Sequence, residues 1–144
     1  MVGIVSYGVY VPYYRLDYQD VAKAWGTAFP KGERAIANYD EDSITMSVAA
    51  GLECLAGIDR GAVDGLYFAS TSSPYKEKQS AALVAEAIDL RRDIVSIDFA
   101  NSLRSATNAV LAAMNAIKGN SAKRILVTAA DCRLGTPCSA LEYT

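Results

Sequence analysis

The sequence contains no histidine. Histidine is the side chain that most often acts as a general base near neutral pH, and it is also the most common metal ligand. The 144 residues therefore carry no imidazole for proton transfer or metal binding. Any mechanism that the chain performs alone has to use carboxylates, hydroxyls, thiols or amines.

Cysteines are few, and their spacing excludes two common uses. An odd number of them, Cys54, Cys132 and Cys138, without C-x-x-C spacing indicates neither a disulfide framework nor a zinc site. We expect ordinary thiols and no bound metal. Cys132 and Cys138 are interpreted as loop residues rather than nucleophiles, and Cys132 is a candidate for lining a pocket.

Long apolar runs and clusters of positive charge are also absent. Nowhere do about 18 apolar residues follow one another, as a membrane-spanning helix requires. The first residues do not form a signal-peptide pattern, so we expect a cytoplasmic protein. A net charge of -2 without a basic run excludes the electrostatic footprint of nucleic-acid or membrane binding. Small molecules and other proteins are the expected partners.

The composition is that of a folded domain. Hydrophobic residues make up 51% of the chain and charged residues 21%, which is typical of globular proteins rather than disordered ones. The length falls in the usual range for one domain with its own core. We therefore expect a single domain over residues 1–144.

Local patterns predict an α/β fold. Runs of β-branched and aromatic residues predict strands at 3–11, 66–69, 94–99 and 124–130. Apolar residues at helical spacing, with capping residues such as Asp17, Gly26, Asp42 and Gly119, predict helices at 17–25, 43–55, 79–88 and 103–118, and 27–39 is expected to be a loop. From residue 66 onward strands and helices alternate, which favours a parallel sheet with right-handed crossovers.

The helix expected at 103–118 has an unusual composition. It has no charged residue between Arg104 and Lys118 and is rich in alanine. A helix without a solvated face is usually buried all round. We expect it to lie in a central layer between two sheets, with one apolar stripe formed by Leu103, Ala106, Val110, Met114 and Ile117.

Several segments together carry a resemblance to a known family. They are GIVSYGVYVP at 3–12 with Tyr14-Arg15, DEDS at 40–43, Ser73-Pro74-Tyr75, VAEAI at 84–88 and SALEYT at 139–144. In this order and spacing they resemble the archaeal-type hydroxymethylglutaryl-CoA synthases of the thiolase and ketoacyl synthase III superfamily. The resemblance covers nearly the whole chain.

The resemblance implies a thiolase-like αβαβα fold made of two similar halves. Residues 1–144 would be the N-terminal half, with a mixed, mainly parallel sheet and a buried central helix, and the C-terminal half would be absent. Acyl-CoA would be the substrate, without a separate cofactor. The partners implied are a second copy of the chain in a homo-oligomer or a related condensing subunit.

The catalytic residues of this family do not carry over. Its nucleophilic cysteine falls on Leu103, both when Asn101-Ser102 is treated as an insertion after Phe99-Ala100 and when Asn101-Ser102-Leu103 is aligned without a gap to the ketoacyl synthase III motif. Its acid/base glutamate falls on Thr71, which cannot transfer a proton as a carboxyl does. The resemblance thus implies a site without its nucleophile and its acid/base.

The residues around these two positions are candidates for lining a pocket. They are Ser72, Asn101, Ser102, Ser105 and Cys132. A serine nucleophile would need a neighbouring general base, and no histidine supplies one. We expect Ser102 to cap the following helix instead.

Three functions remain open from the sequence. The chain is a hydroxymethylglutaryl-CoA synthase-like condensing protein of the acyltransferase family, without the nucleophile and acid/base. Alternatively it is a non-catalytic structural subunit of a heteromeric acyl-CoA condensing complex. The third reading is an acyl-CoA binding module that performs no bond chemistry.

Overall fold

The computed structural model describes residues 1–28, 30–137 and 139. Its regular elements follow one another as β1 (Tyr14–Asp17), α1 (Tyr18–Trp25), β2 (Glu33–Ile36), α2 (Ser43–Cys54), a short 3-10 helix η1 (Arg60–Ala62), β3 (Gly65–Ser70), α3 (Ser80–Ala87), β4 (Val95–Ala100), α4 (Ser105–Lys118) and β5 (Ile125–Ala129).

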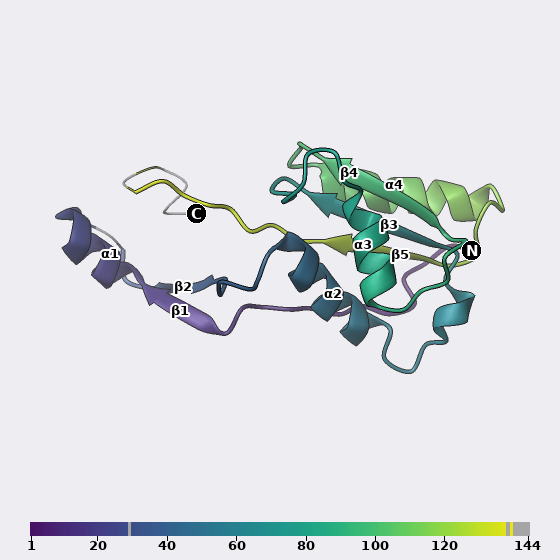
Figure 1. The fold of residues 1–144 in the computed structure, drawn as a ribbon, viewed down its shortest axis with the longest axis horizontal. Helices are drawn as coiled ribbons and strands as arrows, with labels where there is room; N and C mark the ends of the chain where they lie inside the picture. The colour runs from purple at the N-terminus through teal and green to yellow at the C-terminus, as the bar shows by residue number, and fades with distance from the viewer. Residues whose placement is uncertain (29, 138, 140–144) are drawn as a thin grey trace.

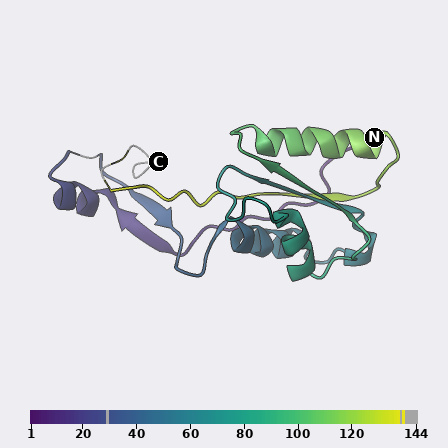
Figure 2. The ribbon, with the colours of Figure 1, turned by 45° about the horizontal axis from the view of Figure 1, so that its top comes forward.

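The body of the molecule is a parallel sheet between two helix layers. The strand order is β4-β3-β5, and β3 pairs in parallel with both neighbours. The chain moves from β3 to β4 in one direction and then crosses back past β3 to β5. With right-handed crossovers this reversal places α3 and α4 on opposite faces. Figures 1 and 2 show α4 on one face and α2 with α3 on the other. The predicted α/β class is confirmed.

Strand β3 is buried along its whole length. Its side chains alternate between two cores, because successive residues of a strand point to opposite faces. Leu66 and Phe68 pack with α2 and α3, whereas Tyr67 and Ala69 pack under α4. A strand that is covered on both faces has a continuous run of apolar residues in its sequence. For this reason the apolar residues 66–69 predicted strand β3 correctly.

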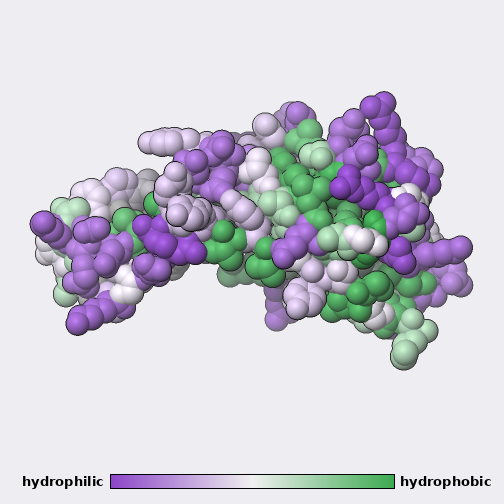
Figure 3. Space-filling view, turned by 90° about the horizontal axis from the view of Figure 1, so that it is seen from below, coloured by the Kyte–Doolittle hydropathy of each residue, from purple (hydrophilic) through white to green (hydrophobic). Residues whose placement is uncertain are grey.

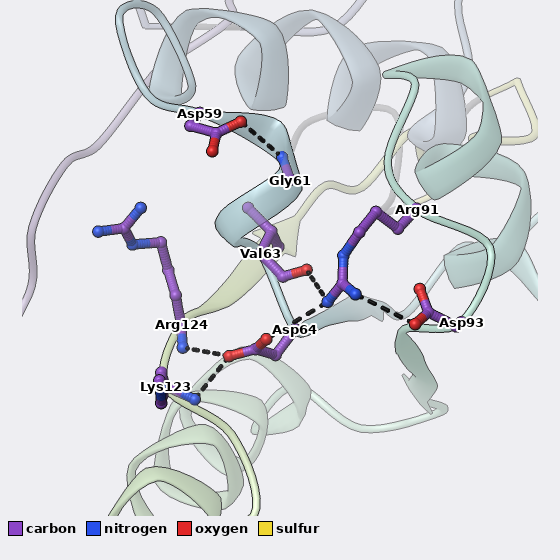
Figure 4. A network of polar contacts seen from close by, with 8 residues as sticks. All are labelled: Asp59, Gly61, Val63, Asp64, Arg91, Asp93, Lys123 and Arg124. Atoms are coloured by element: carbon purple, nitrogen blue, oxygen red, sulfur yellow. Dashed lines mark hydrogen bonds and ion pairs between the residues drawn. The ribbon is translucent and has the colours of Figure 1, made fainter.

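Asp64 connects three segments at the amino end of the sheet (Figure 4). One carboxylate oxygen accepts hydrogen bonds from the backbone N–H groups of Lys123 (2.7 Å) and Arg124 (3.1 Å), just before β5. The other lies 3.4 Å from the guanidinium of Arg91, which also pairs with Asp93 at 3.1 Å. These backbone donors, together with the nearby cations, lower the pKa of Asp64. The contacts align the start of β5 with the start of β3.

The predicted helix ends agree closely with the structure. Asp17 caps α1 by accepting from the N–H of Gln19 at 2.8 Å, and Gly26 ends the helix with a φ of 64°. Asp42 caps α2 through the N–H groups of Ile44 and Thr45, and the Thr45 hydroxyl accepts from Asp42 N in return. Each cap pairs backbone groups that the helix itself leaves free.

The strand predicted at residues 3–11 is not present. This segment pairs with no strand in the part of the chain that the structure describes. It lies against α2, where the Ser6 hydroxyl donates to Cys54 O (2.8 Å) and Val9 N donates to Glu53 Oε2 (2.7 Å). The composition of the segment suits a strand. A strand also needs a neighbouring strand to pair with, and this segment contacts helix α2 instead. Ile4 in this segment is 88% exposed.

The loop predicted at 27–39 contains strand β2, which pairs antiparallel with β1. Both strands are four residues long and mostly exposed, so they lack the apolar run that would reveal them. With α1 they form an arm that projects from the body (Figure 1). Seen from below, hydrophobic side chains gather on the body and the arm is mostly hydrophilic (Figure 3).

Helix α4 is buried on one face only in this chain. Ser105, Ala109 and Ala113 face the sheet, and the opposite side is open. We expected α4 to be buried on most sides, but in this chain it is buried only on the face that carries Ala109 and Ala113. The larger members of the predicted apolar stripe, Val110 and Met114, are exposed in this chain, so their packing stays a prediction. No helix among the described residues is long and apolar enough to cross a membrane.

We expect Gly8→Ala to destabilise the contact between the N-terminal segment and α2. A Cβ at Gly8 would lie 2.4 Å from Ala50 O and 2.5 Å from Cys54 N, both backbone atoms that cannot rotate away. Overpacking of this kind lowers the free energy of unfolding by about 1–3 kcal/mol. Gly3→Ala is the control, since nothing lies within 4 Å of its Cβ position. Equal urea midpoints for the two variants would contradict the packing described here.

Candidate functional site

Three loops meet at the carboxyl ends of β3, β4 and β5, where open parallel sheets usually bind ligands. They enclose a pocket of about 160 Å³. This is below the roughly 300–1,000 Å³ of typical small-molecule sites, so the pocket has room for a small chemical group only. Its lining residues are Ala69, Ser70, Thr71, Ser102, Leu103, Ser105, Ala106, Ala129, Ala130 and Asp131.

Asp131 connects the loops after β5 and β3. Its Oδ1 accepts hydrogen bonds from the Thr71 backbone N–H (2.6 Å), the Ser70 hydroxyl (3.1 Å) and the Ser72 hydroxyl (3.3 Å). The Ser72 oxygen also accepts from Cys132 N at 2.7 Å. The carboxylate therefore fixes the backbone at Thr71, on the wall of the pocket.

The surroundings of Asp131 favour its charged form. Partial burial raises the pKa of the carboxyl, but the hydrogen bonds from Thr71, Ser70 and Ser72 together outweigh it, and the pKa lies below its usual range. A carboxylate held in this way is a weak proton donor near neutral pH. It is suited to positioning the loop rather than to general acid catalysis.

A sharp turn connects β4 to α4. Asn101 adopts a φ of 63°, a left-handed conformation that asparagine tolerates better than most residues. The Ser102 hydroxyl accepts from Arg104 N (3.1 Å), and Ser102 O accepts from the hydroxyl of Ser105 (2.6 Å). The prediction that Ser102 caps the helix is thus wrong in detail: Ser102 closes the turn, and Arg104 at the cap makes no side-chain bond.

The structure brings Leu103 and Thr71 to the same pocket. Leu103 precedes the first residue of α4 and is 81% exposed, so it does not join a packed helical stripe as predicted. The Leu103 side chain has no nucleophilic atom, and the Thr71 hydroxyl would need a neighbouring general base before it could act as a nucleophile. Ser102 and Ser105 also line the pocket, but the buried Ser105 hydroxyl is already bonded to the turn.

The remaining candidates lie beside this pocket. Asn101 and Ser72 lie next to lining residues, and Cys132 lines a neighbouring groove. Partial burial raises the pKa of the Cys132 thiol, and the charges of Asp42 and Glu41 raise it further, which disfavours the thiolate. Cys138 and residues 140–144 of the SALEYT motif lie outside the described residues.

Sequence reasoning missed two polar lining residues, Asp131 and Ser70. Both are polar residues at the carboxyl end of an apolar strand, and that position was the available signal. It also missed the groove, of about 890 Å³, because residues 8–12 and 129–135 come together there only in the folded chain. No three Cys, Asp or Glu side chains within residues 1–28, 30–137 and 139 lie together as a metal site would require.

We expect Asp131→Asn to destabilise the chain at pH 7, with a loss that shrinks in acid. A carboxylate with a lowered pKa stabilises the fold above its unfolded pKa of about 3.9, and this contribution disappears as pH falls through the folded pKa. The difference in unfolding free energy between wild type and variant should thus narrow below about pH 4. Glu77→Gln is the control, because Glu77 is exposed and no hydrogen bond links its side chain to a loop in the described structure. A difference independent of pH would contradict a role for the charge.

The sequence has clear relatives, although no protein-family model matches it. It is 37% identical over 146 residues to the hydroxymethylglutaryl-CoA synthase of Pyrococcus horikoshii, an alignment that covers 99% of this chain and 42% of the synthase. The synthase of Methanobrevibacter smithii is also 37% identical, with 100% of this chain and 44% of the synthase covered. The chain spans less than half the length of these curated relatives.

Solved structures show the same fold. MvaS in complex with 3-hydroxy-3-methylglutaryl coenzyme A superposes with a TM-score of 0.84 at 23% identity, over 96% of this chain and 36% of MvaS. The 3-oxoacyl-[acyl-carrier-protein] synthase III of Aquifex aeolicus gives 0.76 at 26% identity, over 89% of this chain and 44% of that one. Over nearly its whole length, this chain therefore resembles archaeal hydroxymethylglutaryl-CoA synthases and has the fold of thiolase-like ketosynthase III enzymes.

Proposed function

We propose that this chain forms part of an acyl-CoA condensing protein in which another polypeptide segment supplies the reactive groups. The observation that carries the proposal is the pocket at the carboxyl ends of β3, β4 and β5, where Leu103 and Thr71 occupy the places that the resemblance gives to a nucleophile and an acid/base. Acyl-CoA as ligand is supported by the likeness to hydroxymethylglutaryl-CoA synthases. A cytoplasmic location, and an incomplete N-terminal domain, stay predictions.

The chemistry of condensation explains why the chain needs a partner. An acyl thioester must first be transferred to a nucleophile, and a second acyl group must then lose a proton and attack. The pocket offers one carboxylate, Asp131, whose hydrogen bonds hold it in the charged form. It offers no thiol, amine or imidazole among its lining residues. This chain would shape the site and orient the acyl group, without forming a covalent intermediate.

A second candidate function is supported by the open face of α4. Val110, Leu111 and Met114 are 43%, 58% and 36% exposed there, and no charge lies between Arg104 and Lys118. Large exposed apolar patches usually mark protein interfaces. The chain would then act as a non-catalytic subunit that pairs with a second copy or with a related condensing subunit.

We expect that acetyl-CoA leaves the wild-type chain unmodified and that Leu103→Cys accepts an acetyl group slowly. The new thiol would sit just before α4, where the helix dipole lowers its pKa. Condensation should still be absent, because each missing acid/base role contributes on the order of 10²–10⁴-fold. Intact-protein mass spectrometry after incubation with acetyl-CoA measures the adduct.

Leu111→Cys is the matched control, since Leu111 is also exposed but lies in the middle of α4. An equal adduct on both variants would indicate nonspecific acetylation. A stoichiometric adduct on the wild-type chain, followed by turnover with acetoacetyl-CoA, would refute the proposal that this chain is inactive alone.

We expect the chain to self-associate at micromolar concentration through α4. Leu111→Glu would place a charge in the apolar face and should weaken association at least about tenfold, or about 1.4 kcal/mol. Ala82→Glu, on an exposed position of α3, is the control. Sedimentation velocity measures the change. A wild-type chain that stays monomeric, or equal weakening by both variants, would count against an interface at α4.

A further inference from the structure

The arm formed by β1, α1 and β2 joins the body through two short connections, residues 10–13 and 37–41. Its elements pack mainly on one another, and Figures 1 and 2 show it projecting from the body. The first connection follows a segment fixed to α2 by the close contact of Gly8 and by the Val9 N–H. The second ends at Asp42, which caps α2. The direction of the arm is therefore set within these two connections.

Glu41 links the two connections to each other. One of its carboxylate oxygens accepts a hydrogen bond from the Tyr10 hydroxyl, and the other accepts from the Asn38 N–H at 2.7 Å. These two donors lower the pKa of Glu41, so the carboxylate is charged near neutral pH and both hydrogen bonds are charge-assisted. We call this arrangement the Glu41 clamp.

Neither helix capping nor the local turn explains the whole clamp. Asp42 already accepts from the N–H groups of Ile44 and Thr45 at the start of α2, so capping does not need Glu41. The turn at residues 38–41 needs only the bond to Asn38. The bond from Tyr10 crosses 31 positions of the sequence and spans the neck of the arm.

The arm and the loop after β5 form two walls of the groove of about 890 Å³. Residues 34–37 line it from the arm, and residues 129–135 line it from the body. Among its apolar lining residues, Val9, Val11 and Leu134 are each more than half exposed to water. Burial of apolar surface is favourable, so the lining of the groove favours an approach of its two walls.

We propose that the arm is a lid for this groove and that the Glu41 clamp holds the lid open. With the clamp formed, one carboxylate fixes both connections, and the arm cannot turn about them. With the clamp released, the arm would turn toward residues 132–135, and Ile36 and Leu134 on the two walls would be buried. A protein with two such conformations responds to any ligand that favours one of them.

Closure of the lid would also affect the pocket. Ala129, Ala130 and Asp131 line both the groove and the pocket, so the two spaces adjoin along these residues. The closed arm would cover the side of the pocket at Asp131. This control of access does not depend on what the pocket binds, and it therefore goes beyond the proposed function.

The test opens the clamp and measures access to Cys132, which lines the groove. Partial burial, Asp42 and Glu41 all raise the pKa of the Cys132 thiol, so a substitution at Glu41 would change its reactivity directly. Tyr10→Phe avoids this, because it removes the hydroxyl that bonds to Glu41 and leaves the charge in place. Cys54→Ser and Cys138→Ser in the same chain leave Cys132 as its single thiol.

We expect Tyr10→Phe to slow the modification of Cys132 by iodoacetamide at least about threefold, because the released arm closes over the groove. Hydrogen exchange of the amides at 36–37 and 133–135 should slow by at least about threefold as well. Tyr39→Phe is the matched control, since Tyr39 lies in the second connection, is fully exposed, and its hydroxyl forms no hydrogen bond in the described structure.

Three results would overturn the inference. They are an unchanged or faster modification of Cys132 in Tyr10→Phe, an equal slowing in Tyr39→Phe, and faster exchange throughout the body, which would indicate loosening instead of closure. None of these measurements uses acyl-CoA. The lid can therefore fail while the proposed function stands, and the reverse outcome is equally distinguishable.

Discussion

The burial of strand β3 on both faces and its pairing on both edges determine the position of the other elements in the body. Its alternate side chains fill two separate cores, so α2 and α3 must cover one face and α4 the other. Carboxylates fix the two ends of this arrangement: Asp64 bonds to the backbone that starts β5, and Asp131 bonds to the backbone that follows β3. Together they hold β3 and β5 in register, and the pocket lies at the Asp131 end.

The candidate site is built mainly by backbone turns at the carboxyl ends of the strands. The loops after three parallel strands converge, a left-handed Asn101 turns the chain sharply into α4, and the start of that helix borders the pocket. The same features would stabilise a negative charge on a reacting group, because a helix N-terminus carries a partial positive charge. Leu103 and Thr71 both line this pocket, and the loss of catalytic residues that the resemblance implies stays a prediction.

Local signals predicted most of the fold, since caps and apolar runs act within a few residues. Asp17, Asp42 and Gly26 identified helix ends, and the apolar run of β3 identified a buried strand. The composition of segment 3–11 predicts a strand, but composition does not show whether a neighbouring strand is available for pairing. Helical spacing predicts Leu103 in a packed stripe, because spacing does not show that α4 begins only at Ser105. The bonds of Asp131 to Ser70 and Ser72 join residues about 60 positions apart, which no local pattern reveals.

Helix α4 shows how one sequence pattern serves two surfaces. Its small residues, Ala109 and Ala113, face the sheet because the helix packs closely over Tyr67 and Ala69, and larger side chains would hold it away. Its larger residues, Val110, Leu111 and Met114, face outward. Burying apolar surface stabilises a protein by about 25 cal/mol per Å², and these exposed side chains do not gain that stabilisation. If α4 only covered the sheet, polar residues on its outward side would interact better with water than these apolar ones do. The partner proposed at α4 would cover these residues, and it would also account for the absence of charge between Arg104 and Lys118.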